Sequence, residues 1–369
     1  MKKTAIIYDW IDKEGGVERV LPIIAEMYPD ADFYTSYYNP DKAPWASHLK
    51  IRTSFIQKLP PQVRSSRIVS LPFYPLAFES FNLNTYELVI SVTSSFAKGV
   101  ITRPETKHIC YLLTPTRYVW GQTSDYLSPT MQFFAQSVIT KLRKWDYIAA
   151  QRPDKLIAIS NRVAKRIKTY YRRDAEVIYP PFDIEKWKRL DPKNADRDLP
   201  IKDVGFYLFV GRLEPYKRVD LLVDVFTKLH YPLIIIGDGS RSHALKSRAG
   251  SNIVFVSNIS DETLAEYYRK CRALIMPQDE EFGYTAIEAQ LFGAPVISYR
   301  HSAVAETVID GKTGIFFENQ TQADLYNAIA RFEKMEYNMK SRLRKSGLEQ
   351  VKLFNKDSFI SAFSRAIES

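Results

Sequence analysis

Residues 278–306, QDEEFGYTAIEAQLFGAPVISYRHSAVAE, carry the strongest signal in the chain. Within this stretch Glu280 and Glu288 are separated by seven residues that include a Phe-Gly pair. The apolar run Ala273–Met276 just before it predicts a buried strand, and the apolar spacing over Tyr284–Phe292 predicts a helix. Glu280 is therefore expected on the loop after a strand, and Glu288 inside the helix that follows.

This loop has the features of an anion site. Gly283 lies near the predicted helix start, where backbone N–H groups lack partners within the helix and the dipole is positive. Glu280 on the loop and Glu288 on the helix would then reach hydroxyl groups on either side of a bound phosphate. A sugar joined to a nucleoside by a diphosphate carries hydroxyls in both places.

The second half of the chain alternates predicted strands and helices. Strands are predicted over Phe206–Val210, Leu233–Gly237 and Ile253–Val256, and this spacing is typical of a Rossmann-like fold with a parallel sheet. Ligands of such folds bind beyond the carboxyl ends of the strands. The loops after the strands are expected to converge on one crevice, and they carry Arg212, Asp238, Ser257 and Glu280.

Two cations follow the strand at 206–210. Arg212 offers a forked set of N–H donors and Lys217 a compact charge, a pair suited to a diphosphate. On a mere surface helix they would sit at the end where the dipole disfavours cations. A role in holding a diphosphate therefore explains them better.

These motifs, in this order, resemble the retaining GT-B glycosyltransferases of family 4, most closely the bacterial mannosyltransferase-like branch. The resemblance rests on the E-x7-E pattern, on GAPVI at 293–297 with Glu306, on GRLEPYKRVDLL at 211–222 and on IIGDG at 235–239. It implies two Rossmann-like doubly wound α/β domains facing each other across a cleft. The expected parts are an acceptor-side domain, a nucleotide-sugar domain and a C-terminal helix returning to the first domain, at residues 1–180, 181–350 and 351–369.

The resemblance also implies roles for particular residues. Arg212 and Lys217 would stabilise the departing diphosphate, and Glu280 would bind the hydroxyls of the sugar, so these three form the predicted catalytic set. The predicted substrate-binding residues are Gly15, Gly16, Thr114, Arg117, Gly237, Asp238, Ser257, Phe282, Gly283, Tyr284 and Glu288. No metal and no cofactor are expected, since the nucleotide sugar is itself the substrate.

One position departs from the family pattern. A histidine commonly precedes Thr-Pro in the family, whereas this chain has Leu113 before Thr114. The imidazole that often contacts the donor sugar is therefore missing, and His108 is not assigned in its place. Two D-x-D triplets, 30–32 and 196–198, are interpreted as solvated turns rather than metal sites.

The implied function is transfer of a hexose from a nucleotide diphosphate sugar to a hydroxyl, with retention and without metal. GDP-mannose is the favoured donor and a UDP-hexose the alternative. The expected acceptor is a saccharide or a lipid-linked oligosaccharide in cell-surface polysaccharide synthesis. Two other functions stay open: a non-hydrolysing sugar-nucleotide epimerase, and a nucleic-acid-binding protein that uses the basic first half.

The distribution of charge and the amino-acid composition indicate where in the cell the protein is expected. Residues 1–180 contain 25 Lys and Arg against 16 Asp and Glu, so they carry nearly all of the net charge of +10. Residues 31–80 are predicted to be irregular, and the resemblance implies that they face the acceptor; contact with a membrane is the other expectation for them. Residues 133–147 are predicted to form a basic amphipathic helix, which either lies at an anionic membrane surface or is solvated and packed on the first domain. Two cysteines and the absence of a recognisable signal or spanning segment predict a cytoplasmic protein, peripheral at the inner membrane face.

Overall fold

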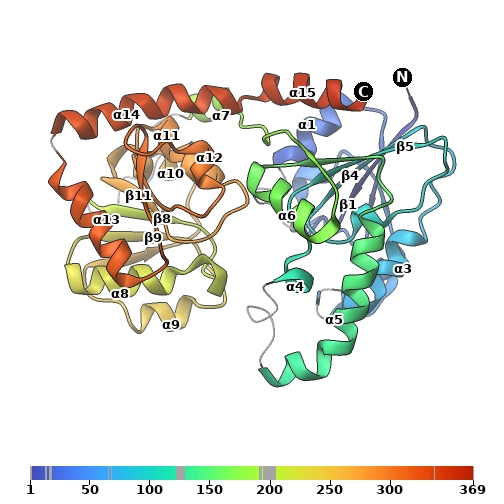
Figure 1. Cartoon of the computed structure of the whole chain (residues 1–369), viewed down its shortest axis with the longest axis horizontal. Helices are drawn as coiled ribbons and strands as arrows, with labels where there is room; N and C mark the ends of the chain where they lie inside the picture. Colours follow the sequence, from blue (N-terminus) through green and yellow to red (C-terminus); the bar gives the residue numbers. More distant parts are fainter. Residues whose placement is uncertain are drawn as a thin grey trace. The chain divides into compact units, whose positions relative to one another are not determined.

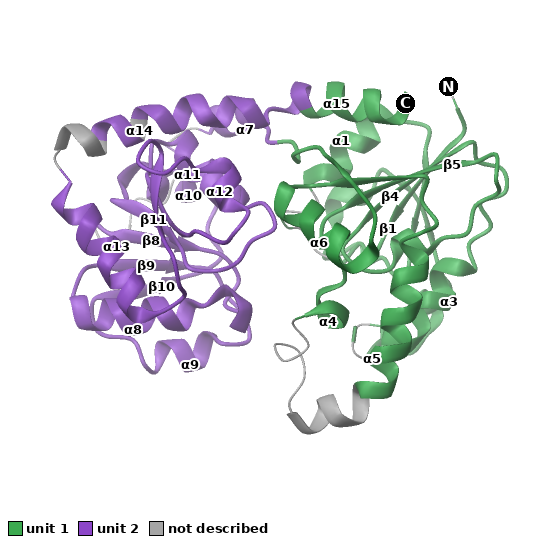
Figure 2. Ribbon diagram, in the orientation of Figure 1, with its two compact units in different colours: residues 1–181, 359–369 green, residues 182–358 purple. Residues whose placement is uncertain are grey.

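The structure is a computed structural model of the 369-residue chain. The described residues are 2–12, 15, 19–64, 66–67, 69–121, 129–190, 193, 205–335 and 337–368, without the side chains of 129–135, 337–340 and 344. The chain divides into two compact units (Figure 2). The first comprises residues 1–181 and 359–369, and the second comprises residues 182–358.

The first unit is built on a seven-stranded parallel sheet with the order β3-β2-β1-β4-β5-β6-β7. The sheet grows from β1 in one direction through β2 and in the other through β4, which is the doubly wound arrangement. Its strands are β1 (Thr4–Tyr8), β2 (Asp32–Thr35), β3 (Lys50–Thr53), β4 (Leu88–Thr93), β5 (Lys107–Leu112), β6 (Lys155–Ala158) and β7 (Glu176–Val177).

Helices flank this sheet, as Figure 1 shows for α1, α3, α5 and α6. They are α1 (Val20–Met27), α2 (Pro61–Arg64), α3 (Tyr74–Glu79), α4 (Arg117–Trp120), α5 (Pro129–Ala149) and α6 (Asn161–Tyr171). Ser160 caps α6, because its side chain accepts a hydrogen bond from the N–H of Val163. The last helix, α15 (Lys356–Glu368), belongs to this unit from Phe359 onward, and its Phe359 and Phe363 rings pack edge-on against Tyr111.

The expectation that residues 31–80 are irregular is wrong. They contain β2 and β3, which extend the sheet beyond β1, with Ile6 opposite Phe33 and Phe33 opposite Ile51. Each strand has only four residues, which is too short for an alternating pattern to stand out. Many aromatic side chains of this segment lie in the core, among them Phe33, Tyr34, Tyr74 and Phe78.

Helix α5 packs on the first unit, which is one of the two roles predicted for residues 133–147. Its residue Trp145 packs against the core of the first unit, and its Nε1 donates a hydrogen bond to Glu79, 2.8 Å away. The indole is therefore partly buried and serves packing. Lys141 and Lys144 on the same helix are exposed. None of the helices formed by the described residues is long and apolar enough to cross a lipid bilayer.

The second unit has a six-stranded parallel sheet with the order β10-β9-β8-β11-β12-β13. Its strands are β8 (Tyr207–Val210), β9 (Leu233–Ile236), β10 (Ile253–Val256), β11 (Ala273–Met276), β12 (Val296–Tyr299) and β13 (Gly314–Phe317). Figure 1 shows helices on both sides of this sheet. They are α7 (Ile184–Lys188), α8 (Val219–Leu229), α9 (Ser242–Lys246), α10 (Asp261–Lys270), α11 (Tyr284–Leu291), α12 (Val304–Thr307), α13 (Gln322–Lys334) and α14 (Tyr337–Val351).

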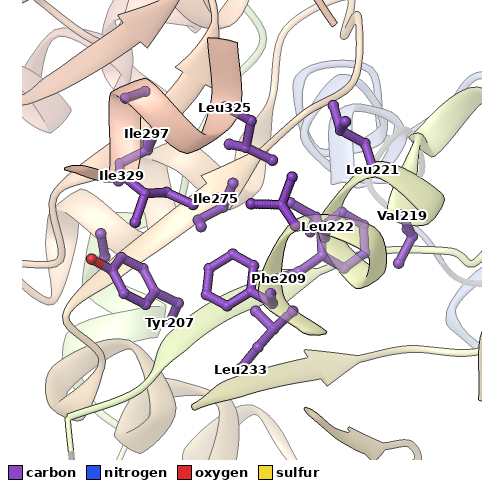
Figure 3. Close-up of a cluster of buried hydrophobic side chains, with 14 of the residues drawn as sticks. Tyr207, Phe209, Val219, Leu221, Leu222, Leu233, Ile275, Ile297, Leu325 and Ile329 are labelled. Carbon is purple, nitrogen blue, oxygen red and sulfur yellow. The ribbon is translucent and has the colours of Figure 1, made fainter. Parts of the chain in front are cut away.

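The core of the second unit lies between this sheet and helices α8 and α13. Tyr207 and Phe209 of β8 point toward Leu222 of α8 and Ile329 of α13, and all four side chains are buried (Figure 3). Burial of each large apolar side chain stabilises the fold by roughly 1.5–3 kcal/mol. Because helices cover both faces, the strands are almost wholly apolar, and polar groups gather in the loops at their ends.

Candidate functional site

In the second sheet the chain order reverses between the parallel neighbours β8 and β11, because the chain continues from them toward opposite edges of the sheet. From β8 the chain proceeds outward through β9 and β10, whereas from β11 it proceeds through β12 and β13. In doubly wound sheets the loops at the carboxyl ends of two such strands diverge and leave a binding position. Here these loops are residues 211–218 after β8 and residues 277–283 after β11.

The two loops are joined by an ion pair between Lys217 and Glu280. The side chains are 14% and 16% exposed, so water screens the pair only partly. Lys217 also lies over the ring of Tyr216, as does Arg212, at 5.6 and 5.7 Å from the ring centre. The aromatic face stabilises both cations and holds two positive charges at one end of the sheet.

Further contacts hold Glu280 in place. Its Oε1 accepts a hydrogen bond of 2.8 Å from Nε2 of Gln278, and its backbone N–H donates to Oγ of Ser302 at 3.0 Å. Its carbonyl accepts from the N–H of Ala303. Since Ser302 and Ala303 follow β12, a third strand end contributes to fixing this carboxylate.

Gly283 starts α11 in the left-handed conformation, with φ of 87°. A Cβ at this position would lie 2.7 Å from Cγ2 of Val304, so only glycine fits. No side chain of the described residues caps this helix start. Beside it Phe282 is buried and packs edge-on against the rings of Tyr284 and Phe354, which gives Phe282 a packing role that the sequence alone did not indicate.

Glu288 lies deeper than Glu280. It is 2% exposed, and its Oε2 accepts a hydrogen bond of 2.8 Å from the hydroxyl of Tyr268 on α10. The Tyr268 contact was not predicted, because nothing in the sequence of α10 relates it to a residue in α11.

The remaining predicted positions of this unit lie after β9 and β10. Gly237 approaches the loop after β8 so closely that a Cβ would be 2.0 Å from the carbonyl oxygen of Gly211. Asp238 is exposed, and hydrogen bonds from the Ser242 hydroxyl and the Gly239 N–H hold the pKa of its carboxyl below the usual value. Ser257 is exposed just beyond β10. These loops follow adjacent strands of the sheet, at the same edge as residues 211–218.

In the first unit the equivalent position, between β1 and β4, is occupied by Asp9. This buried carboxylate accepts hydrogen bonds of 2.8 Å from the N–H groups of Ser94, Phe96 and Ala97 and from the hydroxyl of Thr93. The backbone donors after β4 are therefore already used within the fold. Asp9 was not singled out in the sequence, although it ends the apolar run of the first strand.

Of the two glycines predicted to face a donor, Gly15 is exposed and Gly16 lies outside the described residues. Thr114 is buried, and its hydroxyl donates to the carbonyl of Pro115. Arg117 is partly exposed and begins α4. Leu113, at the position where the family commonly has histidine, is also buried.

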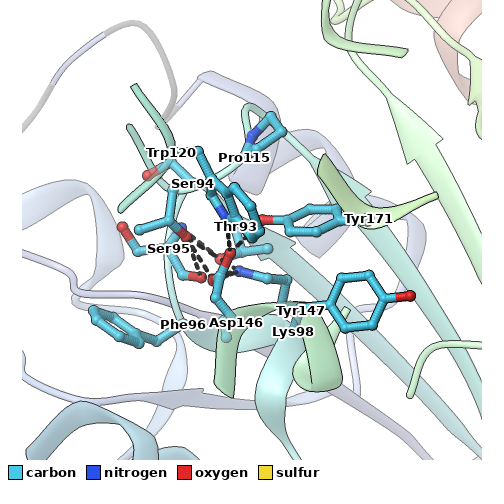
Figure 4. A network of polar contacts seen from close by, with 12 residues as sticks. Thr93, Ser94, Ser95, Phe96, Lys98, Pro115, Trp120, Asp146, Tyr147 and Tyr171 are labelled. Carbon is cyan, nitrogen blue, oxygen red and sulfur yellow. Dashed lines mark hydrogen bonds and ion pairs between the residues drawn. The ribbon is translucent and has the colours of Figure 1, made fainter. Parts of the chain in front are cut away.

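The loop that carries Thr114 and Arg117 is anchored by a buried ion pair, drawn in Figure 4. Nζ of Lys98 lies 2.6 Å from Oδ1 of Asp146, and both side chains are almost completely shielded from water. The same carboxylate accepts hydrogen bonds from the side chains of Thr116, Trp120 and Tyr171. Every oxygen of Asp146 is thus used, and α4 is fixed to α5 and α6.

His108 has no role as a proton carrier at neutral pH. It is fully buried, and burial with the nearby Arg152 and Arg173 lowers its pKa to about 3. Its Nε2 shares a hydrogen bond with the Ser91 hydroxyl at 2.9 Å. The imidazole is therefore neutral and structural.

Acidic clusters of the kind that bind metals do not occur in the part of the chain that the structure describes. In the first D-x-D triplet Asp30 lies exposed in a turn as predicted, whereas Asp32 opens β2 and binds the Tyr86 hydroxyl and Arg52. The second triplet, 196–198, lies outside the described residues.

Comparison with known proteins finds a family model and relatives that match part of the chain. Residues 192–350 match the family model described as Glycosyl transferases group 1. An uncharacterised glycosyltransferase of Methanocaldococcus jannaschii is 28% identical over 212 residues, 56% of this chain and 57% of the relative. A D-inositol 3-phosphate glycosyltransferase of Streptomyces bingchenggensis is 30% identical over 204 residues, 48% and 45% of the two chains. The chain thus spans about half the length of the curated relatives it matches.

Solved structures resemble the whole chain. A sucrose-phosphate synthase from Thermosynechococcus elongatus superposes with a TM-score of 0.77 at 18% identity, over 100% of this chain and 98% of the other. A protein of Anabaena in complex with UDP-glucose superposes with a TM-score of 0.67 at 18% identity, over 99% of each chain. The chain therefore has the two-domain α/β fold of the GT-B glycosyltransferases, and its second half is related in sequence to the glycosyl transferases of group 1.

Proposed function

We propose that the protein is a retaining glycosyltransferase that moves a hexose from a nucleoside diphosphate sugar to an acceptor hydroxyl. The observation that carries this proposal is the pairing of Lys217 with Glu280 at the position between β8 and β11 where doubly wound sheets bind their ligands. The family match over residues 192–350 supports it, because this range contains both residues.

The pair joins the two chemical functions that such a reaction needs. A departing nucleoside diphosphate gains negative charge, and an ammonium group placed at that charge lowers the barrier. A carboxylate accepts hydrogen bonds from sugar hydroxyls and thereby orients the sugar. In the substrate-free protein each group neutralises the other. A bound donor would compete for both, with its diphosphate at Lys217 and Arg212 and its hydroxyls at Glu280.

The donor is a nucleoside diphosphate hexose. Resemblance of the motifs favours GDP-mannose, whereas similar structures were solved with UDP and with UDP-glucose. Both donors therefore belong in the first assay. The proposed acceptor is a hydroxyl of a saccharide or lipid-linked oligosaccharide in cell-surface polysaccharide synthesis, made at the cytoplasmic face of the membrane. Several relatives are named for D-inositol 3-phosphate, which makes it a further acceptor to assay.

Transfer assays with GDP-mannose and with UDP-glucose, each with and without EDTA, test this function. The nucleotides without a sugar, GDP and UDP, serve in a parallel measurement of binding by thermal stability. We expect one donor to give a product of retained anomeric configuration, at a rate that EDTA leaves unchanged, since Lys217 and Arg212 supply the positive charge. A nucleotide present at 100 times its Kd should stabilise the protein by roughly 2.7 kcal/mol. A sugar altered while still attached to the nucleotide would instead identify an epimerase.

Replacement of Lys217 by alanine examines the site itself. Loss of one charge-stabilising group should cost about 2.7–4 kcal/mol in the barrier, on the order of a 10²–10³-fold fall in kcat. Lys228→Ala is the matched control, because Lys228 is exposed on α8 of the same unit and bonds only Gln322 among the hydrogen bonds resolved. Equal kcat values for the two variants would show that the diphosphate binds elsewhere.

A further inference from the structure

Gln278 is a buried amide beside the candidate carboxylate. It lies two residues after β11 and is 1% exposed. The backbone of this loop is fixed by a residue that follows β13, because Nε2 of Gln320 donates to the carbonyl of Pro277 at 2.7 Å. The side chain of Gln278 therefore has little freedom to move away from Glu280.

The orientation of this amide follows from its partner. Nε2 lies 2.8 Å from Oε1 of Glu280. The opposite orientation would place a carbonyl oxygen against a carboxylate, so the N–H group must face Glu280. Its own Oε1 is buried and has no hydrogen-bond partner among the described residues. A buried carbonyl without a partner is unfavourable, and an apolar side chain would avoid this cost. The N–H group is therefore what this position requires.

Oε1 of Glu280 accepts from Lys217 and from Gln278 at once. If a donor diphosphate draws Lys217 toward itself, as the proposed function requires, Glu280 loses this cation. A partly buried carboxylate that loses a cation has a greater tendency to take up a proton. The amide of Gln278 would then still donate to Oε1 and keep the carboxylate charged and in place.

We propose, on the basis of the proposed function, that Gln278 is the positioning residue for Glu280 when the donor is bound. It acts through Glu280 and does not itself bind the diphosphate. Its loss should therefore lower kcat, whereas the affinity for the nucleoside diphosphate should change little.

Gln290 provides a matched control. It is equally buried, and its Oε1 also lacks a partner among the described residues, but its Nε2 donates to the backbone carbonyls of Ala286 and Thr307. A substitution there disturbs a buried amide of the same kind without touching Glu280. Comparison of the two positions separates positioning of the carboxylate from a general effect on packing.

The experiment compares Gln278→Met and Gln278→Glu with Gln290→Met and Gln290→Glu in the full chain. Gln278→Met keeps the volume and removes the N–H donor, so kcat should fall about tenfold to a hundredfold, as expected for a hydrogen bond to a charged group. The Kd of the nucleoside diphosphate should stay within about threefold. Gln290→Met should change neither kcat nor Kd by more than about threefold.

Gln278→Glu adds a measurement, the pH dependence of kcat, that a change in packing alone would not alter. Two adjacent carboxyl groups share a proton, and the carboxyl group introduced at position 278 can, when protonated, donate to Glu280 as the amide does. Relative to wild type, kcat should recover as the pH falls from 8.5 to 5.5, and Gln290→Glu should show no such recovery. The comparison of Gln278→Glu with Gln290→Glu still tests the role of Gln278 if the Gln278→Met variant does not fold.

Unchanged kcat in Gln278→Met, or the wild-type pH profile in Gln278→Glu, would overturn the role of Gln278 alone. Absence of transfer by the wild-type protein from every nucleotide sugar would overturn the proposed function and this role together. The two failures are therefore distinguishable by the wild-type assay.

Discussion

Gly283 shows how a single backbone conformation shapes the site. With φ of 87°, it lets the loop after β11 turn into α11, and Val304 packs where a side chain would be. Asp238 and His108 show that a polar side chain can serve the fold, because Asp238 accepts hydrogen bonds from Ser242 and Gly239 and Nε2 of His108 shares one with Ser91. Residue type alone therefore does not identify a functional group, and the partners of each side chain must be known.

Gly283→Ala should destabilise the protein by about 1–3 kcal/mol, from a left-handed backbone combined with a close contact to Val304. Gly311→Ala is the control, since Gly311 has φ of 71° and no atom within 4 Å of an added Cβ. The Gly311→Ala variant should therefore lose only the free energy of unfolding that the left-handed backbone costs an alanine. Urea unfolding of both variants measures the difference, and equal losses would contradict the steric argument.

His108 should make stability depend on pH. Burial lowers its folded pKa to about 3, whereas the unfolded side chain titrates near 6.5. Between these values the unfolded state binds one more proton, so stability falls as the pH falls below about 6.5. At pH 5 His108 should lower the free energy of unfolding by about 2 kcal/mol relative to neutral pH.

Removal of the imidazole tests this assignment. His108→Gln should lose less stability than wild type between pH 7 and pH 5, measured by urea unfolding at both values. The difference between the two proteins isolates the histidine from the carboxyl groups that also titrate. A pH dependence identical to that of wild type would mean that His108 does not set it.

Elements of the first unit are tied together by the Lys98–Asp146 pair. It connects the end of β4 with α4, α5 and α6 through the partners of one carboxylate. Such a buried pair adds little net stability, because desolvation offsets attraction, but breaking it leaves an unpaired buried charge. The pair therefore fixes where α4 and its Arg117 lie.

Lys98→Ala should destabilise the protein by about 3–5 kcal/mol, because Asp146 then remains buried without its cation. Lys144→Ala on the exposed face of α5 should change stability by less than about 0.5 kcal/mol. Thermal or urea unfolding provides the comparison. A small loss for Lys98→Ala would indicate that Asp146 takes up a proton or reaches water instead.

At the scale of the whole molecule, charge is distributed unevenly between the two halves. The excess of Lys and Arg in residues 1–180 favours an anionic surface, and Lys141 and Lys144 on α5 are exposed. Trp145 adds little to that surface, because it is partly buried against the core of the first unit. We therefore propose that attraction to the membrane is electrostatic and that it weakens as salt is added.

The double variant Lys141→Ala/Lys144→Ala should bind anionic vesicles more weakly by about 2 kcal/mol, roughly a thirtyfold loss of affinity at low salt. Lys228→Ala/Lys246→Ala removes the same charge from exposed positions of the second unit and should bind like wild type. Vesicle co-sedimentation distinguishes them. Equal binding by both double variants would exclude this face of α5 as the contact.

The sequence by itself determined the alternation of strands and helices and the loops on which Arg212, Lys217, Gly283 and Glu280 lie. These features are local, since each depends on the spacing of apolar residues and glycines within one segment. The strands β2 and β3 escaped prediction because four residues are too few for such a pattern. The GT-B fold was predicted differently, from the resemblance of several motifs in their order along the chain.

Only the tertiary structure decided which side chains meet. Lys217 and Glu280 are separated by 63 positions, and Tyr268 reaches Glu288 from another helix. Gln278 acquires its place because residues after β12 and β13, Ser302 and Gln320, fix the loop that follows β11. Contacts of this kind follow from strand order and burial, which no single segment encodes, so the roles of these residues toward a donor are predictions for experiment.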